Sequence, residues 1–375
     1  MKNKLKRLVC MAAAATMAVS LAACGSEGDG SSAGSSNSGG SDATAESGNT
    51  AETSEETSTS GEEGEKYVIG AAMYDLTNTF YVNMMNAGNE AAEDYGCEVI
   101  WQSSEGSLDN EISIIENFIQ QKVDCIMIDP IDAEGIKAVV EKAGEAGIPV
   151  ITMGNKVETD YNVNTLYNDY DDTYAIAKMI AEEIGGSGTV GLVYGNSGNY
   201  VSDQRQAGFK DAMADYPDIT IVEQPGNFNT STAMTVAADM LNAYPDIKAI
   251  HSVSDAQTYG VLQAIQAAGM SDQILLTSYD GEQEASDYVG TGEFACTLLT
   301  GSKRVGYWNV KVAYDLCSGK EVEPEQYIKS YFILNDELAS IAKEQELVEE
   351  DRILTAEEGR AMFDDYSDYK PENAQ

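Results

Sequence analysis

The feature that most constrains the fold is a repeated alternation of short apolar runs and helical stretches that begins at Tyr67. The apolar runs are rich in β-branched residues, and each is followed by a polar or glycine-containing loop and then by a stretch with helical apolar spacing. Consecutive strands that return to one sheet in the same direction need a crossover, which is usually a helix. The alternation therefore predicts an α/β fold with parallel sheets.

The alternation falls into two sets. In the first set, strands are expected at 67–73, 97–102, 125–129, 148–153 and 161–166, with helices near 79–94, 109–121, 134–146 and 170–185. In the second set, strands are expected at 189–195, 219–224, 248–253, 274–280 and 294–299, with helices near 201–215, 230–243, 256–268 and 282–290. Two such sets predict two doubly wound lobes.

The amino terminus has the pattern of an export signal. Basic residues at 2, 4, 6 and 7 precede a mostly apolar run from Leu8 to Ala23, which is shorter than the ~20 residues that span a bilayer. The segment Leu21-Ala22-Ala23-Cys24 resembles the lipobox of bacterial lipoproteins, in which cleavage before the cysteine leaves its thiol carrying a lipid. We expect residues 1–23 to be a lipoprotein signal peptide and Cys24 to be lipidated. The alternative is an ordinary signal peptide with an incidental cysteine.

Residues 24–65 are predicted to be a tether. After Cys24 the stretch lacks Val, Ile, Leu, Met, Phe, Trp and Tyr, so no apolar burial offsets the entropy of ordering it. As a disordered Gly/Ser/Glu chain it has an r.m.s. reach of roughly 35 Å. A lipid at Cys24 would then be the only membrane attachment of a folded domain that begins near Lys66.

Charge and cysteine content exclude some partners. The net charge of −41 repels nucleic acid and anionic lipid head groups, so neither is an expected partner. Cysteines 97, 125 and 296 stand in apolar runs, where a thiol behaves as a small hydrophobe. Together with Cys317 they match no disulfide or zinc framework, although their redox state stays open. We expect no metal and no cofactor.

The candidate site consists of residues that follow the predicted strands. In parallel sheets the loops at the carboxyl ends of the strands converge on one crevice. The first set places there Tyr74, Asp75, Asn78, Phe80, Tyr81, Asp129, Asp132 and Asn155, and the second set Asp203, Arg205, Phe228, Ser254, Asp255 and Asp280. Carboxylates and amides bond hydroxyl groups, and aromatic faces cover the C–H patches of a ring. This lining suits a neutral polyol.

The order of these motifs resembles a known family. From Tyr67 to about Leu334 the chain carries "YDLTNTFY", "IDPID", "AGIPVITMGNK", "RQAGF", "NFN", "SVSDAQTYGVLQAIQAAG" and "LLTSYDG". This succession resembles the periplasmic sugar-binding proteins of the ribose and galactose type, which are solute-binding components of ABC transporters. The resemblance implies the type I periplasmic binding protein fold and a monosaccharide carried in an interlobe cleft to the permease subunits.

The resemblance also implies a domain plan and a set of ligand contacts. One lobe would comprise residues 66–168 plus 301–325 and the other 169–300 plus 326–375, joined by a three-crossing hinge. The stacking aromatics fall on Phe80, Tyr81 and Phe228, the first-loop amide on Asn78 and the hydroxyl-binding carboxylate on Asp280. The sequence departs from the ribose-type pattern at Gly154-Asn155, Asp203, Arg205, Ser254 and Thr300. These departures leave the sugar open.

The sequence also bears on functions other than sugar binding. The only histidine, His251, lies in the strand-like "KAIHSV", and no G-x-S-x-G motif is present. Asp129 and Asp132 could be paired carboxylates of a glycoside hydrolase, but neither is marked as a general acid. We therefore expect no enzyme. A DNA-binding regulator would need an amino-terminal helix pair and a basic surface. This chain instead has an export signal and a strong negative charge, so we do not expect that function. Two alternatives stay open: a sensory subunit that presents ligand to a membrane receptor or kinase, and a binder of a cationic or amino-bearing solute.

The segment after Leu334 extends beyond the resemblance. It is acidic and has helical spacing in "ELASIAKEQEL" and "AEEGRAMF". We expect a helical extension packed on the second lobe. The whole protein is expected to be a monomer, anchored by lipid to the outer face of a bacterial cytoplasmic membrane on its periplasmic or extracellular side.

Overall fold

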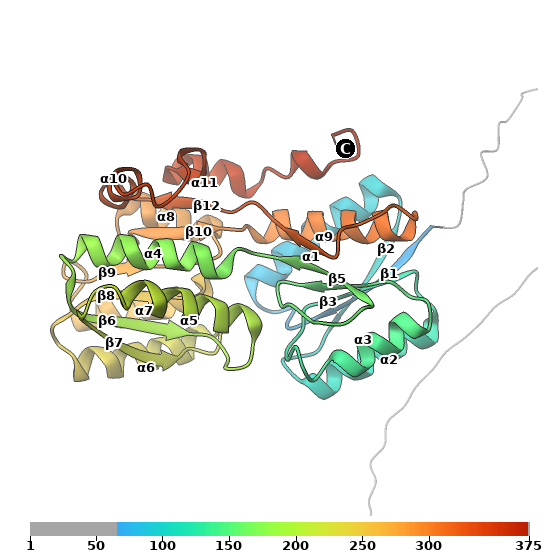
Figure 1. Ribbon diagram of the computed structural model, residues 1–375, viewed down its shortest axis with the longest axis horizontal. Coiled ribbons are helices and arrows are strands. Elements are labelled where there is room, and N and C mark those ends of the chain that lie inside the picture. The colour runs from blue at the N-terminus through green and yellow to red at the C-terminus, as the bar shows by residue number, and fades with distance from the viewer. Residues whose placement is uncertain (1–65, 374–375) are drawn as a thin grey trace, which may run out of the picture. The chain divides into compact units, whose positions relative to one another are not determined.

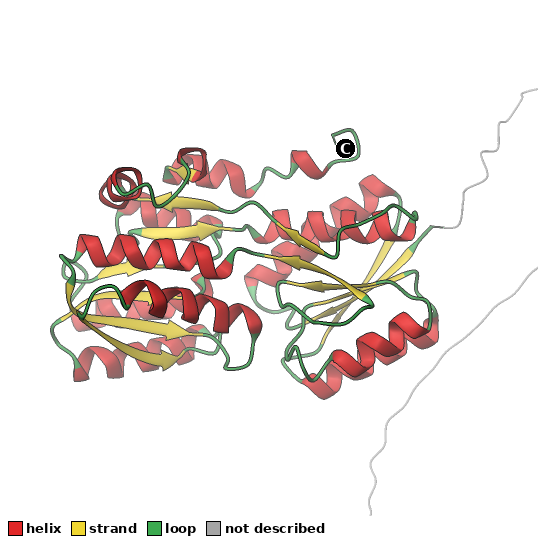
Figure 2. Ribbon diagram, viewed as in Figure 1, coloured by secondary structure: helices red, strands yellow, loops and turns green. Residues whose placement is uncertain are grey.

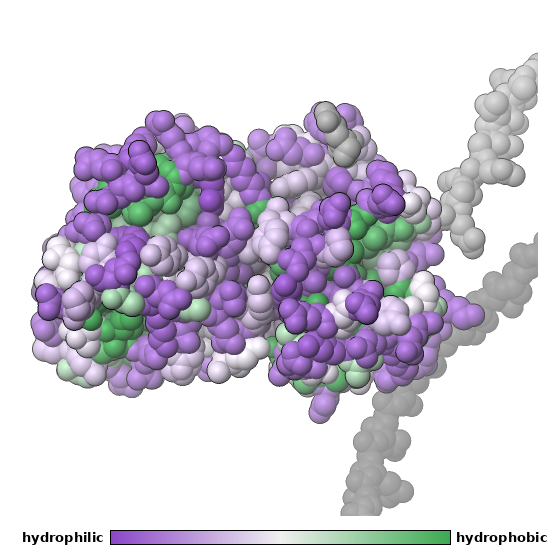
Figure 3. All heavy atoms as spheres, in the orientation of Figure 1, coloured by the Kyte–Doolittle hydropathy of each residue, from purple (hydrophilic) through white to green (hydrophobic). Residues whose placement is uncertain are grey.

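The computed structural model describes residues 66–373. The predicted signal peptide, Cys24 and the tether lie outside the described residues, so their predictions stand as made. Among residues 66–373, no helix has the length and apolar character needed to cross a bilayer. Polar side chains cover most of the face shown in Figure 3, as the acidic composition leads one to expect.

The first lobe is built on a six-stranded parallel sheet (Figures 1 and 2). Its strand order is β11-β5-β4-β3-β1-β2, where β1 is Val68–Met73, β2 Glu98–Ser103, β3 Cys125–Ile128, β4 Val150–Met153, β5 Asn162–Leu166 and β11 Glu325–Tyr327. The central strands β3 and β4 are buried along their whole length. Parallel strands covered on both faces read as continuous apolar runs, which is how the sequence revealed them.

Helices cover both faces of this sheet. They are α1 (Thr79–Tyr95), α2 (Leu108–Gln121), α3 (Lys137–Glu145) and α9 (Ser302–Cys317). The α1 and α9 helices pack against each other, and their apolar residues form one core cluster with β1. Asn78 and Ser107 cap α1 and α2 by accepting backbone N–H bonds, so both helices begin directly after a strand-end loop.

The second lobe holds a seven-stranded sheet of order β13-β12-β10-β9-β8-β6-β7. The strands are β6 (Ser187–Tyr194), β7 (Asp218–Pro225), β8 (Ile247–Ser252), β9 (Leu275–Thr277), β10 (Cys296–Leu299), β12 (Tyr331–Leu334) and β13 (Ile353–Leu354). All of its neighbouring strands are parallel except β10 and β12. The predicted α/β class with two parallel-sheet lobes is confirmed, with one antiparallel pair added.

The helices of the second lobe follow its strands in the same way. They are α4 (Asp169–Glu183), α5 (Tyr200–Met213), α6 (Thr230–Ala243), α7 (Asp255–Ala268), α8 (Gln283–Thr291), α10 (Asp336–Glu344) and α11 (Ala356–Phe363). Asn199, Asn229 and Ser254 cap α5, α6 and α7, so these helices also begin at the strand-end loops.

Three connections pass between the two sheets. The first lies between β5 and α4, the second between β10 and α9, and the third between β11 and β12. Because β11 pairs with β5 in the first sheet, the third connection follows Tyr327 instead of the expected boundary at 325. The two short 3₁₀ helices, Glu350–Arg352 and Ser367–Tyr369, belong to the carboxyl-terminal extension.

The end of the chain departs from the expectation that residues 326–375 belong with the second lobe. The α10 and α11 helices do pack there, against α4 and α8. Tyr366 and Tyr369, however, pack against the core cluster of the first lobe. An acidic stretch with few apolar residues carries no periodicity that could have indicated this docking.

Candidate ligand-binding cleft

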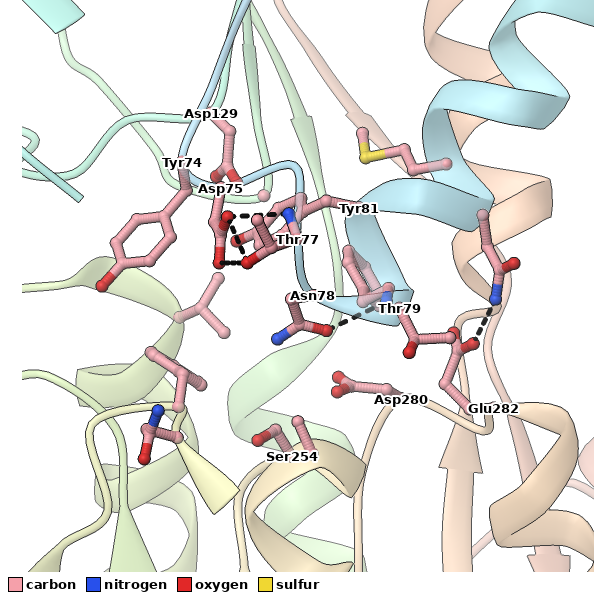
Figure 4. Close-up of a pocket in the computed structure, with 18 of the residues that line it drawn as sticks. Tyr74, Asp75, Thr77, Asn78, Thr79, Tyr81, Asp129, Ser254, Asp280 and Glu282 are labelled. Atoms are coloured by element: carbon pink, nitrogen blue, oxygen red, sulfur yellow. Dashed lines mark hydrogen bonds between the residues drawn. The ribbon is translucent and has the colours of Figure 1, made fainter. Parts of the chain in front are cut away.

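A cleft of about 1090 Å³ lies between the lobes, at the carboxyl ends of their strands. Figure 4 shows residues of both lobes pointing into it. The residues predicted from the sequence that line it are Tyr74, Asp75, Asn78, Phe80, Tyr81, Asp129 and Asn155 from the first lobe and Arg205, Phe228, Ser254 and Asp280 from the second. The strand-end rule thus predicted residues that line this cleft from both lobes.

The first lobe presents an aromatic cluster to the cleft. The rings of Tyr74 and Tyr81 stack with centroids 6.1 Å apart, and Phe80 meets Tyr81 edge to face at 5.3 Å. Asn78 holds the loop that carries them, because its Oδ1 accepts a bond from the Phe80 amide at 3.0 Å. These rings offer flat apolar surface beside polar groups.

Asp129 is the buried carboxylate of the first lobe. It accepts a hydrogen bond from Asn155 Nδ2 at 3.2 Å, and both side chains are almost fully buried. Burial raises the pKa of Asp129 to about 6, against the opposing effect of hydrogen bonds from Tyr81 and Asn155. The Asp129 carboxylate can accept further hydrogen bonds, and ligand hydroxyl groups are suitable donors.

Arg205 and Asp280 form the charged pair of the second lobe. Arg205 Nη1 donates to Asp280 Oδ1 at 3.1 Å and to the Val253 carbonyl at 2.6 Å, while Nε donates to Asp169 at 2.7 Å. The guanidinium also lies 3.5 Å from the ring centre of Tyr279. Arg205 is therefore held rigidly and fixes the Asp280 carboxylate at the edge of the cleft.

Asp280 lines the cleft and also accepts hydrogen bonds within the second lobe. Its Oδ2 accepts from the Asp255 amide at the start of α7 at 3.3 Å. Burial raises the pKa of Asp280 to about 6, although Arg205 lowers it. Its side chain is 13% exposed, so one edge of the carboxylate still faces the cleft.

Phe228 reaches the cleft from a strained loop. Its φ of 52° is left-handed, and its amide donates to Gln257 Oε1 at 2.7 Å. The ring lies on Gly195, where an added Cβ would come within 2.3 Å of it. The ring packs against the core clusters of both lobes. The backbone therefore aims this aromatic side chain between the lobes.

Hydrogen bonds join the two lobes across the cleft. Asn83 Nδ2 donates to Glu282 Oε2 at 2.8 Å, Asn196 Nδ2 donates to the Tyr74 hydroxyl at 3.1 Å, and the Val201 amide donates to Asn155 Oδ1 at 3.1 Å. Burial raises the pKa of Glu282 to about 7. Opening the lobes would separate every one of these pairs.

Four predicted site residues do not line the cleft. Asp132 is exposed, and its Oδ1 accepts bonds from the amides of Glu134 at 2.9 Å and Gly135 at 2.8 Å. Asp203 lies on the exposed face of α5. Helix residues two positions apart point about 200° away from each other, and Arg205 faces the cleft. Asp255 is fully buried, and its carboxylate accepts from Thr297 Oγ1 at 2.9 Å, from the Glu282 amide at 2.7 Å and from the Ser278 hydroxyl. Thr300 is buried at the connection into α9.

Other lining residues were missed. They include Asn83, Tyr167, Tyr259 and Glu282. Tyr167 directly follows β5 and Glu282 follows Asp280 by two positions, so a wider window around the strand ends would have included them. Asn83 lies on the same face of α1 as Thr79, four residues earlier, and only helical spacing could have indicated it.

The histidine and the four cysteines of the described residues do not line the cleft. His251 is buried, stacks on Phe209 and bonds Thr277 through Nδ1, and burial lowers its pKa to about 3. Among residues 66–373, no group of three or more His, Cys, Asp or Glu side chains is placed to hold a metal ion. The cysteines at 97, 125, 296 and 317 are free thiols.

The fold and the cleft define a two-lobed solute-binding protein. Residues 69–321 match the periplasmic binding protein domain, and the chain belongs to this family.

Curated relatives share most of the domain. The ribose import binding protein RbsB of Bacillus subtilis is 28% identical over 266 residues, covering 70% of this chain and 86% of the relative. The D-ribose/D-allose-binding protein of Pseudomonas aeruginosa is 27% identical over 277 residues, covering 71% and 86%.

Among solved structures, an ABC transporter periplasmic solute-binding protein of Actinobacillus succinogenes with bound D-allose superimposes with a TM-score of 0.69. It is 27% identical and covers 73% of this chain and all of that one. These likenesses confirm the predicted family resemblance.

Proposed function

We propose that this chain captures a monosaccharide between its lobes and delivers it to the permease subunits of an ABC importer. The observation that carries the proposal is a cleft that combines aromatic rings from both lobes with the buried carboxylate of Asp129 and the partly buried carboxylate of Asp280. Rings cover the faces of a sugar and carboxylates accept its hydroxyl hydrogens. The sugars named for the relatives support the same class of ligand.

The proposal includes release of the ligand unchanged. The cleft residues described above bind, and none forms a nucleophile–base pair. We further propose that the protein works outside the cytoplasmic membrane as a monomer held by a lipid on Cys24. Replacing Cys24 by alanine should move the protein from the membrane to the soluble fraction, and unchanged fractionation would contradict the anchor.

A thermal-shift screen of the chain from residue 25 onward tests the binding function. The panel contains D-ribose, D-allose, D-galactose, D-fructose, myo-inositol and D-glucosamine. A ligand at 100 times its Kd adds ~2.7 kcal/mol of stability, which is roughly 5 to 10 °C in melting temperature for lobes of this size. A shift with a neutral sugar that is recovered intact supports the proposal. A shift only with D-glucosamine would indicate an amino-bearing ligand, and chemical change of the sugar would contradict a binding protein.

A further inference from the structure

The carboxyl-terminal extension connects the two lobes a fourth time. We call residues 363–370 the C-terminal strap. Its first anchor is Phe363, the last residue of α11, which is 2% exposed and belongs to the second-lobe core cluster with Val289 and Ile333. The α11 helix is itself fixed to α8, where Arg360 pairs with Asp287.

The second anchor lies on the first lobe. The ring of Tyr366 stacks on Tyr307 of α9 with centroids 4.7 Å apart, and its hydroxyl bonds Glu90 of α1. Tyr369 adds a contact with Trp308 at 6.4 Å between ring centroids, and its carbonyl accepts a bond from the Tyr95 hydroxyl. Figure 1 shows this end of the chain running from α11 toward α9.

The strap borders the cleft. Phe363 lines it, and so does Lys303, which forms an ion pair with Asp364 in the strap. The cleft is also lined by Glu282, which bonds Asn83 across the lobes. Separating the lobes would stretch the strap.

The strap has little slack to absorb such a movement. Phe363 and Tyr366 are three residues apart, so the chain between them spans at most ~11 Å. Tyr307 lies about 7.5 Å along α9 from Ser302, where the second connection ends, so it moves with the first lobe. A gap of only ~1 Å between stacked rings loses a quarter to a half of their attraction.

We propose that the C-terminal strap opposes opening of the lobes and thereby slows release of the ligand. Its aromatic contacts with α9 exist only while the lobes are close, so they favour the closed arrangement by a difference in contacts. The effect on release rests on the proposed function. The restraint on opening does not, because it acts on the ligand-free protein.

Small-angle X-ray scattering of the ligand-free chain tests the restraint. The variants are a truncation after Asp365 and the single substitution Tyr366→Ala. The control is Tyr244→Ala, which removes a tyrosine that is 40% exposed at the end of α6 and does not line the cleft. We expect both strap variants to show a larger radius of gyration than the wild type and the control. Equal radii for all four proteins would overturn the proposal.

Ligand kinetics form the second arm, with D-allose and D-ribose as probes. We expect the strap variants to bind about 3- to 30-fold more weakly, mainly through faster dissociation. If no sugar of the thermal-shift panel binds the wild type, the proposed function is contradicted while the scattering comparison still decides the strap. If the truncated chain loses its cooperative unfolding transition, the comparison of Tyr366→Ala with the wild type decides whether the strap restrains opening. Unchanged dissociation rates in a variant with an enlarged radius would overturn the link to release.

Discussion

Replacing Asp280 by asparagine should weaken ligand binding much more than it weakens the fold. The carboxylate has internal partners in Arg205 Nη1 at 3.1 Å and the Asp255 amide at 3.3 Å, and its remaining edge faces the cleft. Asparagine keeps the shape but replaces one acceptor oxygen with a donor, which leaves a desolvated ligand hydroxyl unpaired. We expect a loss of ~2 to 3 kcal/mol in affinity, or roughly 30- to 150-fold in Kd.

The effect of Asp280→Asn on stability should be smaller. Arg205 keeps its closer bond to Asp169 at 2.7 Å, so we expect the free energy of unfolding to fall by only ~1 to 2 kcal/mol. Calorimetric titration gives the affinity, and urea unfolding without ligand gives the stability.

Asp255→Asn is the matched control. Asp255 is also a carboxylate that follows a strand, but it is fully buried and does not line the cleft. It should lower stability by ~1 to 3 kcal/mol and change Kd by no more than about twofold. Normal affinity in Asp280→Asn, or an equal loss of affinity in the control, would refute the placement of the ligand.

Further predictions concern a ring and the buried carboxyl groups. Phe228→Ala should weaken binding by ~1 to 3 kcal/mol, because it removes a stacking face, and a titration with near-normal Kd would place the ring outside the site. Affinity should rise between pH 5 and 7, because ligand hydroxyl groups bond the ionised forms of Asp129 and Asp280, whose pKa values are raised to about 6; a flat profile would contradict this. Glu111 is fully buried, and burial raises its pKa from 4.5 to about 8, so the folded state favours the protonated form and loses stability as the pH rises from 4.5 through 8. Glu111→Gln should remove that loss, which is at most ~5 kcal/mol. If the free energy of unfolding in urea changes equally with pH in both proteins, this prediction is contradicted.

The fold could be predicted because buried strands leave recognisable runs of apolar residues in the sequence. The runs at β3 and β4 are apolar throughout, since helices cover both faces of the sheet. The strand expected at 274–280 is the exception, because β9 ends at Thr277 and Asp280 makes only an isolated bridge to Leu299. Asp280 has a positive φ of 114°, which interrupts regular strand geometry, and no sequence pattern indicated it.

The site was harder to predict residue by residue. Asp255 and Asp280 both follow strands, and only tertiary contacts separate them: Thr297 and the Glu282 amide enclose the first, while the second keeps an exposed edge. The contact between Tyr366 and Tyr307 could not be predicted either, because it joins residues that are distant in the sequence and leaves no periodic pattern there.

A crystal structure of the chain with a sugar that gives a thermal shift tests the placement of the ligand directly. We expect one sugar ring between the lobes, stacked on Phe228, with hydroxyl groups within hydrogen-bond distance of Asp129 in the first lobe and Asp280 in the second. A sugar bound on the outer surface, or one that touches a single lobe, would contradict it.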